Sequence, residues 1–229
     1  MWLAWEEAEA RIYDDLTRDG SRIVRWVHDS GHRLLESPFG RDVHFGRVLE
    51  VGAGTGQHLS FVRHRFDTYL MTDINADLLA QAGRKHEGTP GVRFEVRDAT
   101  DLGYEEASFD RVISVYNLEH LPFPHRVIEG WRRLLRPGGT LSIAFPTEGG
   151  VAWRLGRHLT TRRSFTRWGL DLDYIIAREH INTCANLVSL VRHYFPDLRQ
   201  TWFPLGIPLS DVNLIYCCHA IRGGAESDR

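Results

Sequence analysis

The stretch VLEVGAGTGQH, residues 48–58, constrains the fold of this chain more than any other. Residues 48–51 are an apolar run short enough to be a buried strand. The glycines that follow alternate along the chain: Gly52, Gly54 and Gly56. Residues 57–65 then predict a helix. A strand, a glycine turn and a helix N-terminus together form a pocket where backbone N–H groups face a ligand, and glycine lets that ligand approach closely.

Three nucleotide-binding patterns compete with an ordinary tight turn as explanations of this loop. A Walker loop requires Lys-Ser or Lys-Thr after the glycines, and neither is present there. A dinucleotide fingerprint, GxGxxG, requires a glycine where Gln57 stands, which also disfavours a dehydrogenase. The remaining pattern, ExGxGxG, resembles motif I of the class I S-adenosylmethionine-dependent methyltransferases. This resemblance implies S-adenosylmethionine as cofactor and S-adenosylhomocysteine as product. The loop residues that it assigns to the cofactor are Glu50, Gly52, Ala53, Gly54 and Gly56.

Two acidic positions follow the loop in the order that this family uses. The strand predicted over residues 67–72 ends at Asp73, which the resemblance assigns to the ribose hydroxyls, with Ile74 next to it. The competing role for Asp73 is the N-cap of the following helix. A strand predicted over residues 92–96 leads to Asp98 and Ala99, which would contact the adenine, and to Leu102, which would flank it. An ordinary surface turn is the alternative there.

A third match follows the apolar strand predicted over residues 109–115. The segment FDRVISVYNLEHLP resembles motif IV of small-molecule methyltransferases, including the ubiquinone and menaquinone enzymes. Because ligands of open α/β sheets bind beyond the carboxyl ends of the strands, we expect Tyr116 and Asn117 beside the sulfonium. The resemblance is strong over residues 46–146 and weaker after them.

The resemblance implies an α/β fold with a doubly wound, seven-stranded, mostly parallel sheet in the order 3-2-1-4-5-7-6. Residues 1–40 are predicted to form an N-terminal helical lid, for which Tyr13 and Trp26 are candidates. Residues 41–147 and 183–222 would form the Rossmann-like core, which ends in an antiparallel strand pair. Residues 148–182 are too many for a simple connection and are predicted to form a small helical cap that recognises the acceptor.

The predicted cap is rich in arginine and in aromatic residues. Its arginines are Arg154, Arg157, Arg162, Arg163 and Arg167. They would either clamp an anionic or aromatic ligand, because guanidinium groups suit phosphate and carboxylate, or form a solvated helix face. The acceptor is therefore predicted to be a small molecule, either an aromatic natural product or a sugar or nucleotide-sugar.

Methyl transfer from a sulfonium is an in-line displacement in which the protein supplies position and, for some acceptors, a base. The candidate bases are Tyr116, Glu119, His120, Glu179 and His180. Histidine is favoured because its pKa lies near neutrality, although His120 has a structural reading as well. No metal is expected, because the helically spaced pair His28 and His32 lacks a third ligand.

Composition limits the other classes of function. A chain of 229 residues that is 42% hydrophobic fits one large α/β domain, and its net charge of −2 gives no reason to expect nucleic acid. Its three cysteines include no CxxC pair and suit the cytoplasm, and no apolar run is long enough to span a membrane. A homodimer is compatible with these features. The alternatives are a nucleic-acid methyltransferase, whose [DN]PP[FYW] signature is missing where YNLEHLP stands, and a non-catalytic binding protein that keeps the cofactor fold.

Overall fold

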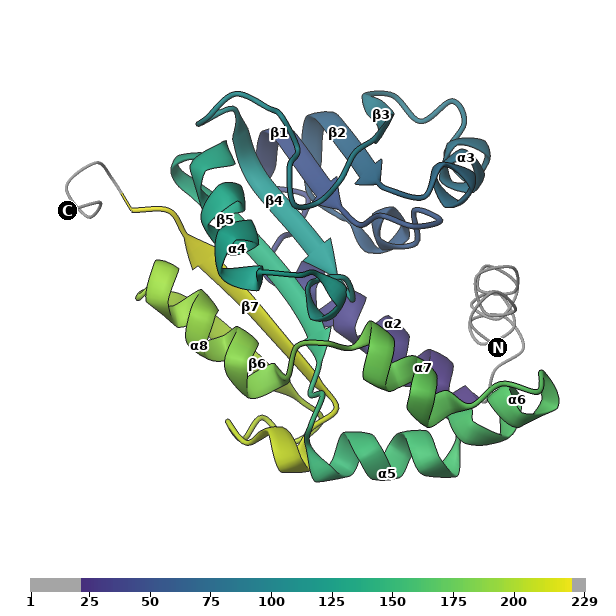
Figure 1. The fold of residues 1–229 in the computed structure, drawn as a ribbon. Helices are drawn as coiled ribbons and strands as arrows, with labels where there is room; N and C mark the ends of the chain where they lie inside the picture. The colour runs from purple at the N-terminus through teal and green to yellow at the C-terminus, as the bar shows by residue number, and fades with distance from the viewer. Residues whose placement is uncertain (1–21, 224–229) are drawn as a thin grey trace.

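The computed structural model describes residues 22–223, and its centre is one twisted sheet (Figure 1). The seven strands are ordered β3-β2-β1-β4-β5-β7-β6, which confirms the predicted order. In chain order they are β1 (His44–Val51), β2 (Arg65–Asp73), β3 (Val92–Val96), β4 (Phe109–Val115), β5 (Leu135–Pro146), β6 (Leu198–Phe203) and β7 (Ile215–Ile221). β7 runs antiparallel to both β5 and β6, and the other neighbours are parallel.

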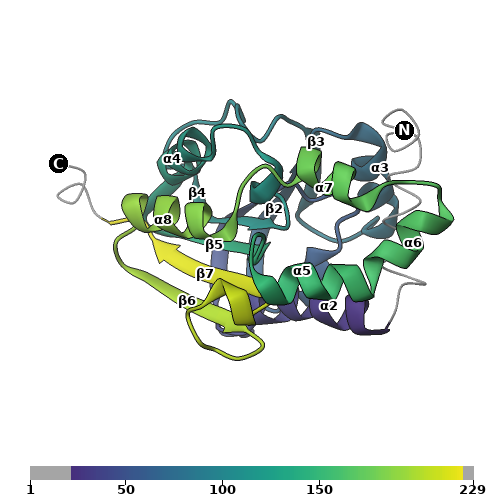
Figure 2. The same cartoon turned by 60° about the horizontal axis from the view of Figure 1, so that its bottom comes forward.

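Helices cover both faces of the sheet and one of its ends (Figures 1 and 2). The α-helices are α2 (Arg22–Glu36), α3 (Ala76–Lys85), α4 (Pro124–Leu134), α5 (Val151–Leu159), α6 (Thr161–Arg167), α7 (Leu172–Glu179) and α8 (Cys184–Tyr194). Short 3-10 helices are η2 (His58–Phe61), η3 (Leu118–His120) and η4 (Ser210–Val212). α4 and α8 pack on one face, α2 and α3 on the other, and α5, α6 and α7 lie beyond the carboxyl ends of β4 and β5.

Successive residues of the central strands divide between the two faces, as strand geometry requires. Leu49 packs in the layer of α4 and α8, whereas the preceding Val48 packs in the layer of α2 and α3. The adjacent Cys217 and Cys218 divide in the same way, and both are buried free thiols. The two cysteines therefore serve as small buried side chains, one in each layer of the core.

The helix predicted over residues 57–65 is wrong. The structure has only the four-residue η2 there, and β2 begins at Arg65, two residues before the predicted start. The reason is pairing, because β1 begins at His44 and takes Arg65 as its partner. The residues between the glycine loop and β2 are then too few for a full helix, and α2 covers this part of the sheet instead.

The segment LRPGGT, residues 135–140, has the composition of a turn but belongs to β5. α4 ends at Leu134, and β5 already starts at Leu135. The register with β4 shifts between Phe109 and Arg111, so the turn residues form an irregular start of the strand. Gly138, at φ +79°, provides the positive φ within this irregular stretch.

The end of α2 is fixed to the sheet by a buried ionic network. Arg111, which is completely buried on β4, contacts both carboxylate oxygens of Glu36, at 2.8 and 3.1 Å. Glu36 Oε1 also bonds His58 Nε2 at 2.9 Å, and His58 Nδ1 meets His32 Nδ1 at 2.9 Å. α2 is therefore joined to β4 and to η2, the segment that directly follows the glycine loop.

Predictions for residues 1–21, including the lid role of Tyr13, lie outside the described residues. The other candidate for that role, Trp26, is half exposed and packs on Phe203, with ring centroids 5.0 Å apart. Among residues 22–223, no helix has the length and apolar character needed to cross a membrane.

Candidate active site

The glycine loop follows β1 and is held against β2. The backbone N–H groups of Gly52 and Ala53 each donate to the carbonyl oxygen of Thr72 at 2.9 Å. All three glycines of the loop have positive φ, between +51° and +72°, where L side chains are strained. A Cβ on Gly52 would stand 2.3 Å from Cγ of Asn117, whereas a Cβ on Gly54 would meet nothing within 4 Å. The loop is thus packed at Gly52 and open at Gly54, where a ligand can reach the backbone.

Asp73 braces this loop rather than capping the next helix. Its Oδ2 accepts a hydrogen bond from the backbone N–H of Gly54 at 2.8 Å, and its Oδ1 accepts one from Asn75 at 2.8 Å. The N-cap of α3 is Asn75, whose side chain accepts from the N–H groups of Asp77 and Leu78. The N-cap alternative for Asp73 is therefore wrong, and its carboxylate lies at the open side of the loop.

Two exposed apolar side chains lie at the carboxyl ends of the neighbouring strands. Ile74, directly after β2, is 70% exposed, and Val96, the last residue of β3, is 55% exposed. Val96 is the register partner of Asp73. Exposed apolar residues at this edge, next to the carboxylate, suit contact with a flat heterocycle.

The segment after β3 forms a tight turn. Asp98 Oδ1 accepts from the N–H and the hydroxyl of Thr100 at 2.8 and 2.7 Å, and the carbonyl of Ala99 accepts from Trp131 Nε1 at 3.2 Å. The backbone N–H of Ala99 and the second oxygen of Asp98 remain compatible with an adenine. Leu102 is buried in the hydrophobic core, which does not support its expected position flanking the adenine.

Glu50 lies beneath the loop in the interior of the sheet. Its side chain is 3% exposed and accepts a hydrogen bond from Tyr69 Oη at 2.7 Å. Burial raises the pKa of Glu50, against the opposing effect of His58. This arrangement supports the strands that carry the loop, so we interpret Glu50 as a support of the cofactor site and not as a contact.

Tyr116 and Asn117 connect the loop with a second site. Asn117 Nδ2 donates to the carbonyl of Val51 at 3.4 Å, so its side chain lies over Gly52. Tyr116 has φ +55°, and its Oη donates to the carbonyl of His28 on α2 at 2.9 Å. The strained conformation of Tyr116 turns its ring away from the loop and towards α2.

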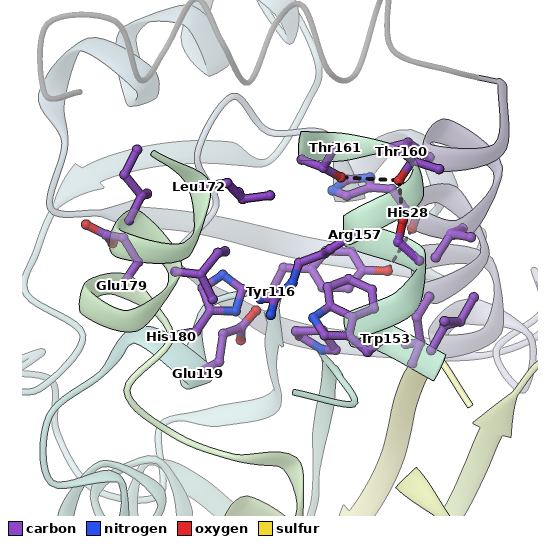
Figure 3. Close-up of a pocket in the computed structure, with 18 of the residues that line it drawn as sticks. His28, Tyr116, Glu119, Trp153, Arg157, Thr160, Thr161, Leu172, Glu179 and His180 are labelled. Atoms are coloured by element: carbon purple, nitrogen blue, oxygen red, sulfur yellow. Dashed lines mark hydrogen bonds between the residues drawn. The ribbon is translucent and has the colours of Figure 1, made fainter. Parts of the chain in front are cut away.

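Beyond Tyr116 lies a cavity of about 260 Å³ between α2 and the helices α5, α6 and α7 (Figure 3). Most of its wall is apolar. The apolar lining includes Val24, Val27, Leu172, Ile175 and Ile176. Glu119, His180 and Glu179 lie on the same side in the close-up, near the carboxyl ends of β4 and β5, and we call this side the polar end; Thr160 and Thr161 lie on the opposite side.

Glu148, the second residue after β5, accepts hydrogen bonds from three donors next to this polar end. Its Oε2 lies 2.8 Å from His180 Nδ1, 2.8 Å from Trp153 Nε1 and 2.9 Å from Arg157 Nη1. Burial acts to raise the pKa of Glu148, but the hydrogen bond from His180 and the charge of Arg157 outweigh it and lower the pKa. Because Nδ1 of His180 donates to Glu148, the neutral ring carries its hydrogen on Nδ1 and its other nitrogen, Nε2, is an acceptor.

His120 forms a second carboxylate-supported histidine next to the first. Its Nδ1 lies 3.0 Å from the carbonyl of Glu179 and 3.5 Å from Oε2 of the same residue, and its ring is 4.7 Å from that of His180 in an edge-on arrangement. Burial acts to lower the pKa of His120, but the side chains of Glu179 and Glu119 outweigh it and raise the pKa. The structure thus brings four of the candidate bases, Glu119, His120, Glu179 and His180, together at one end of the cavity.

Most cap arginines point away from the cavity. Arg157 lines it, but its charge is paired with Glu148. Arg154 and Arg162 are exposed on the outer side, where Arg162 lies 3.4 Å from Asp173. An anionic clamp inside this cavity is therefore not supported, whereas Arg154, Arg157 and Arg162 line a separate concavity together with His158 and Asp173.

Glu148 was missed by the sequence analysis. Its position gives a usable signal, because a carboxylate just after a central strand of an open α/β sheet falls at the ligand crevice. Trp153 and Arg157 were noted only as part of a charged and aromatic stretch. Their convergence on Glu148 depends on tertiary packing and has no local signature.

Comparison with known proteins places residues 49–143 in the family described as "Methyltransferase domain". The chain is 33% identical over 129 residues to a phosphatidylethanolamine N-methyltransferase of Cereibacter sphaeroides, which covers 52% of this chain and 63% of that protein. It is 33% identical over 122 residues to methyltransferase GfsG of Streptomyces halstedii, covering 51% and 44% of the two chains. The chain thus spans less than two thirds of the curated relatives that it matches first.

A solved structure has the same fold over nearly its whole length. The N-methyltransferase NodS from Bradyrhizobium japonicum, in complex with S-adenosylhomocysteine, superposes with a TM-score of 0.62 at 16% identity. The match covers 95% of this chain and 97% of that chain. At this identity the likeness supports the fold alone.

Proposed function

We propose that this chain is a methyltransferase that transfers a methyl group from S-adenosylmethionine to a small molecule with an apolar body, and the match of residues 49–143 to a methyltransferase family model supports this. The observation that carries the proposal is the apolar cavity that begins at Tyr116, whose neighbour Asn117 packs on the glycine loop. A cofactor on the loop and an acceptor in the cavity would then meet at these two residues.

The loop side of this junction fits S-adenosylmethionine. Gly54 leaves open space where the ligand would approach, and Asp73, already oriented by two backbone N–H groups, keeps lone pairs for a ribose diol. Ile74 offers an exposed apolar face, and Asp98 with the N–H of Ala99 would meet the polar edge of the adenine. When bound, the cofactor supplies a methyl carbon on a sulfonium, which the acceptor atom attacks in line.

The lining of the cavity favours an apolar acceptor over a nucleotide-sugar. A phosphorylated acceptor requires unpaired cationic donors, and the one guanidinium among the described residues that line the cavity is paired with Glu148. The helices α2 and α7 present aliphatic side chains instead. This supports the natural-product part of the expected acceptor class and disfavours the sugar-phosphate part.

His180 is the best-placed candidate base. Its Nδ1–H donates to Glu148, which orients the ring and leaves Nε2 able to accept a proton. His120, next to it, is the second candidate, with Glu179 supporting its Nδ1. Tyr116 is less suited, because burial raises the pKa of its phenol well above the ordinary value and its hydroxyl already donates to His28.

The division of the chain follows from the same geometry. Residues 148–182 would act as the cap, because α5, α6 and α7 supply one wall of the cavity. α2, within the proposed lid of residues 1–40, supplies the opposite wall through Ile23, Val24 and Val27. Residues 41–147 and 183–222 would form the core that holds the cofactor.

Calorimetric titration with S-adenosylmethionine, S-adenosylhomocysteine and NAD tests the proposal. We expect binding of the first two and none of NAD. The variant Gly54→Ala should lower the affinity for S-adenosylhomocysteine about tenfold or more, because the added Cβ fills the open face of the loop. Gly88→Ala is the matched control, since Gly88 also has positive φ with open space around it but lies away from the site. Equal affinities of the two variants, or binding of NAD alone, would refute the cofactor assignment.

A further inference from the structure

Glu119 carries an unpartnered oxygen at the polar end of the cavity. Its side chain is 2% exposed and lines the cavity from η3. Within residues 22–223, Oε2 of this carboxyl has no hydrogen-bond partner. Buried polar atoms without a partner are rare and costly, so such an atom facing a cavity indicates a ligand that completes it.

The charges around this oxygen indicate what kind of ligand would complete it. Two carboxyl groups line this end of the cavity, those of Glu119 and Glu179, together with the guanidinium of Arg157 and the ring of His120, whose Nε2 lies 3.9 Å from Oε1 of Glu119. Arg157 is committed to Glu148 at 2.9 Å, so it does not balance Glu119. A carboxylate or phosphate group on the acceptor would face the unpartnered Oε2 of Glu119 and be repelled by it, whereas a group that donates hydrogen bonds and carries positive charge would be attracted.

We propose that the methyl acceptor is an amine with an apolar chain or ring, and that Glu119 Oε2 binds the amine nitrogen at the polar end of the cavity. This inference rests on the proposed methyl transfer. The aliphatic walls formed by α2 and α7 would hold the apolar part of the acceptor, and the carboxylate would hold its polar end.

The histidines complete the chemistry that an amine requires. An ammonium ion has no lone pair, so one proton must leave before the nitrogen can attack. His180 Nε2, in the acceptor tautomer set by Glu148, takes that proton. The nitrogen lone pair then forms the new N–C bond, while the S–C bond breaks and its electron pair stays on sulfur. The products are the methylated ammonium ion, S-adenosylhomocysteine and protonated His180.

An amine also explains why an acidic side chain is tolerated at this depth. Burial raises the pKa of Glu119, against the effects of His120 and His180, because the ionised carboxylate is poorly solvated at this depth. A bound ammonium would favour the carboxylate and form a charge-assisted hydrogen bond with it. A neutral hydroxyl would gain much less from the same group.

The test compares three probes that share an eight-carbon alkyl chain, namely octylamine, 1-octanol and octanoate. Their binding to the protein saturated with S-adenosylhomocysteine is measured by calorimetry at neutral pH. We expect octylamine to bind about tenfold or more tightly than either other probe. Glu119→Gln should remove most of that preference and leave the affinity for S-adenosylhomocysteine unchanged. The control Glu129→Gln, at a carboxylate exposed on α4, should keep the preference. With S-adenosylmethionine, octylamine should yield N-methyloctylamine, detected by mass spectrometry.

The outcomes separate this inference from the function on which it rests. If S-adenosylhomocysteine does not bind, the proposed methyl transfer fails and the amine inference fails with it. If S-adenosylhomocysteine binds but octanol or octanoate binds as tightly as octylamine, only the amine inference is overturned. The same follows if Glu119→Gln keeps the full preference for octylamine, because another group would then provide the selectivity.

Discussion

Replacing Glu36 by Gln tests the buried network that joins α2 to the sheet. The carboxylate of Glu36 is 3% exposed and is paired with Arg111, which is completely buried, through contacts of 2.8 and 3.1 Å. Glutamine keeps the size of the side chain but leaves the guanidinium in the interior without a counter-charge. Breaking a buried pair in this way typically costs about 3–5 kcal/mol.

The pKa of Glu36 gives the same magnitude by a separate route. Burial acts to raise this pKa, but Arg111 and His58 lower it from 4.5 to about 2. At about 1.36 kcal/mol per tenfold change in the proton equilibrium, this corresponds to about 3 kcal/mol in favour of the ionised carboxylate in the folded state. Because the folded pKa is depressed, this stabilisation is complete above pH 4.5 and is lost as the pH falls towards 2.

Urea unfolding followed by circular dichroism at pH 7 measures the effect. We expect Glu36→Gln to lower the free energy of unfolding by about 3 kcal/mol with little change in the slope against urea. Glu129→Gln is the matched control, because the ion pair of Glu129 with Arg133 on α4 is solvent-exposed. It should cost less than about 1 kcal/mol. A loss below about 1 kcal/mol in Glu36→Gln, or equal losses in the two variants, would refute the reasoning.

Two further predictions concern the same layer. Burial and Arg111 lower the pKa of His64 from 6.5 to about 4, so the folded state favours the neutral ring and loses stability as the pH falls from 6.5 towards 4. In urea unfolding at pH 7, 5.5 and 4, the free energy of unfolding of His64→Gln should fall by about 3 kcal/mol less than that of the unchanged chain. Parallel losses in the two proteins would contradict this. In α2, Gly31→Ala would place a Cβ 2.1 Å from Tyr116 Oη, so we expect it to lower the free energy of unfolding in urea by about 1–3 kcal/mol. The control Gly83→Ala in α3, where a Cβ meets nothing within 4 Å, should be neutral or stabilising. Equal effects of the two variants would show that Tyr116 is free to move.

The strands and the order of the sheet could be predicted because each depends on local patterns or on motifs. The apolar run at residues 109–115 matches β4, and the resemblance supplied the strand order, including the final antiparallel pair. The segment 57–65 shows the limit of such reasoning. Its sequence permits a helix, but pairing of Arg65 with His44 extends β2 into it, and that long-range pairing has no signature within the segment.

The candidate site divides in the same way. The glycine loop and Asp73 were found because their spacing along the chain is itself the signal, and the structure joins Asp73 to Gly54. Glu148 was not found, because its role depends on donors from two separate helical segments that meet only in the folded chain. For the cap arginines, the sequence suggested a ligand-binding role without revealing their partners. A run of charged residues does not show which side chain, such as Arg157, is neutralised by a carboxylate elsewhere in the fold.

The packing of α2 on β7 sets the order in which the two halves of the site can form. Cys217 Sγ contacts the carbonyl of Gly31 at 3.8 Å, across 186 residues of sequence. Contacts between residues so far apart form late, because the loop between them must close first. During synthesis the strands around the glycine loop, and the contact of Glu36 with Arg111 that holds the end of α2 on β4, can therefore form before β7 completes the surface under α2. A chain that ends before β7 is expected to keep the glycine loop and to lose Ile215 from the wall of the cavity.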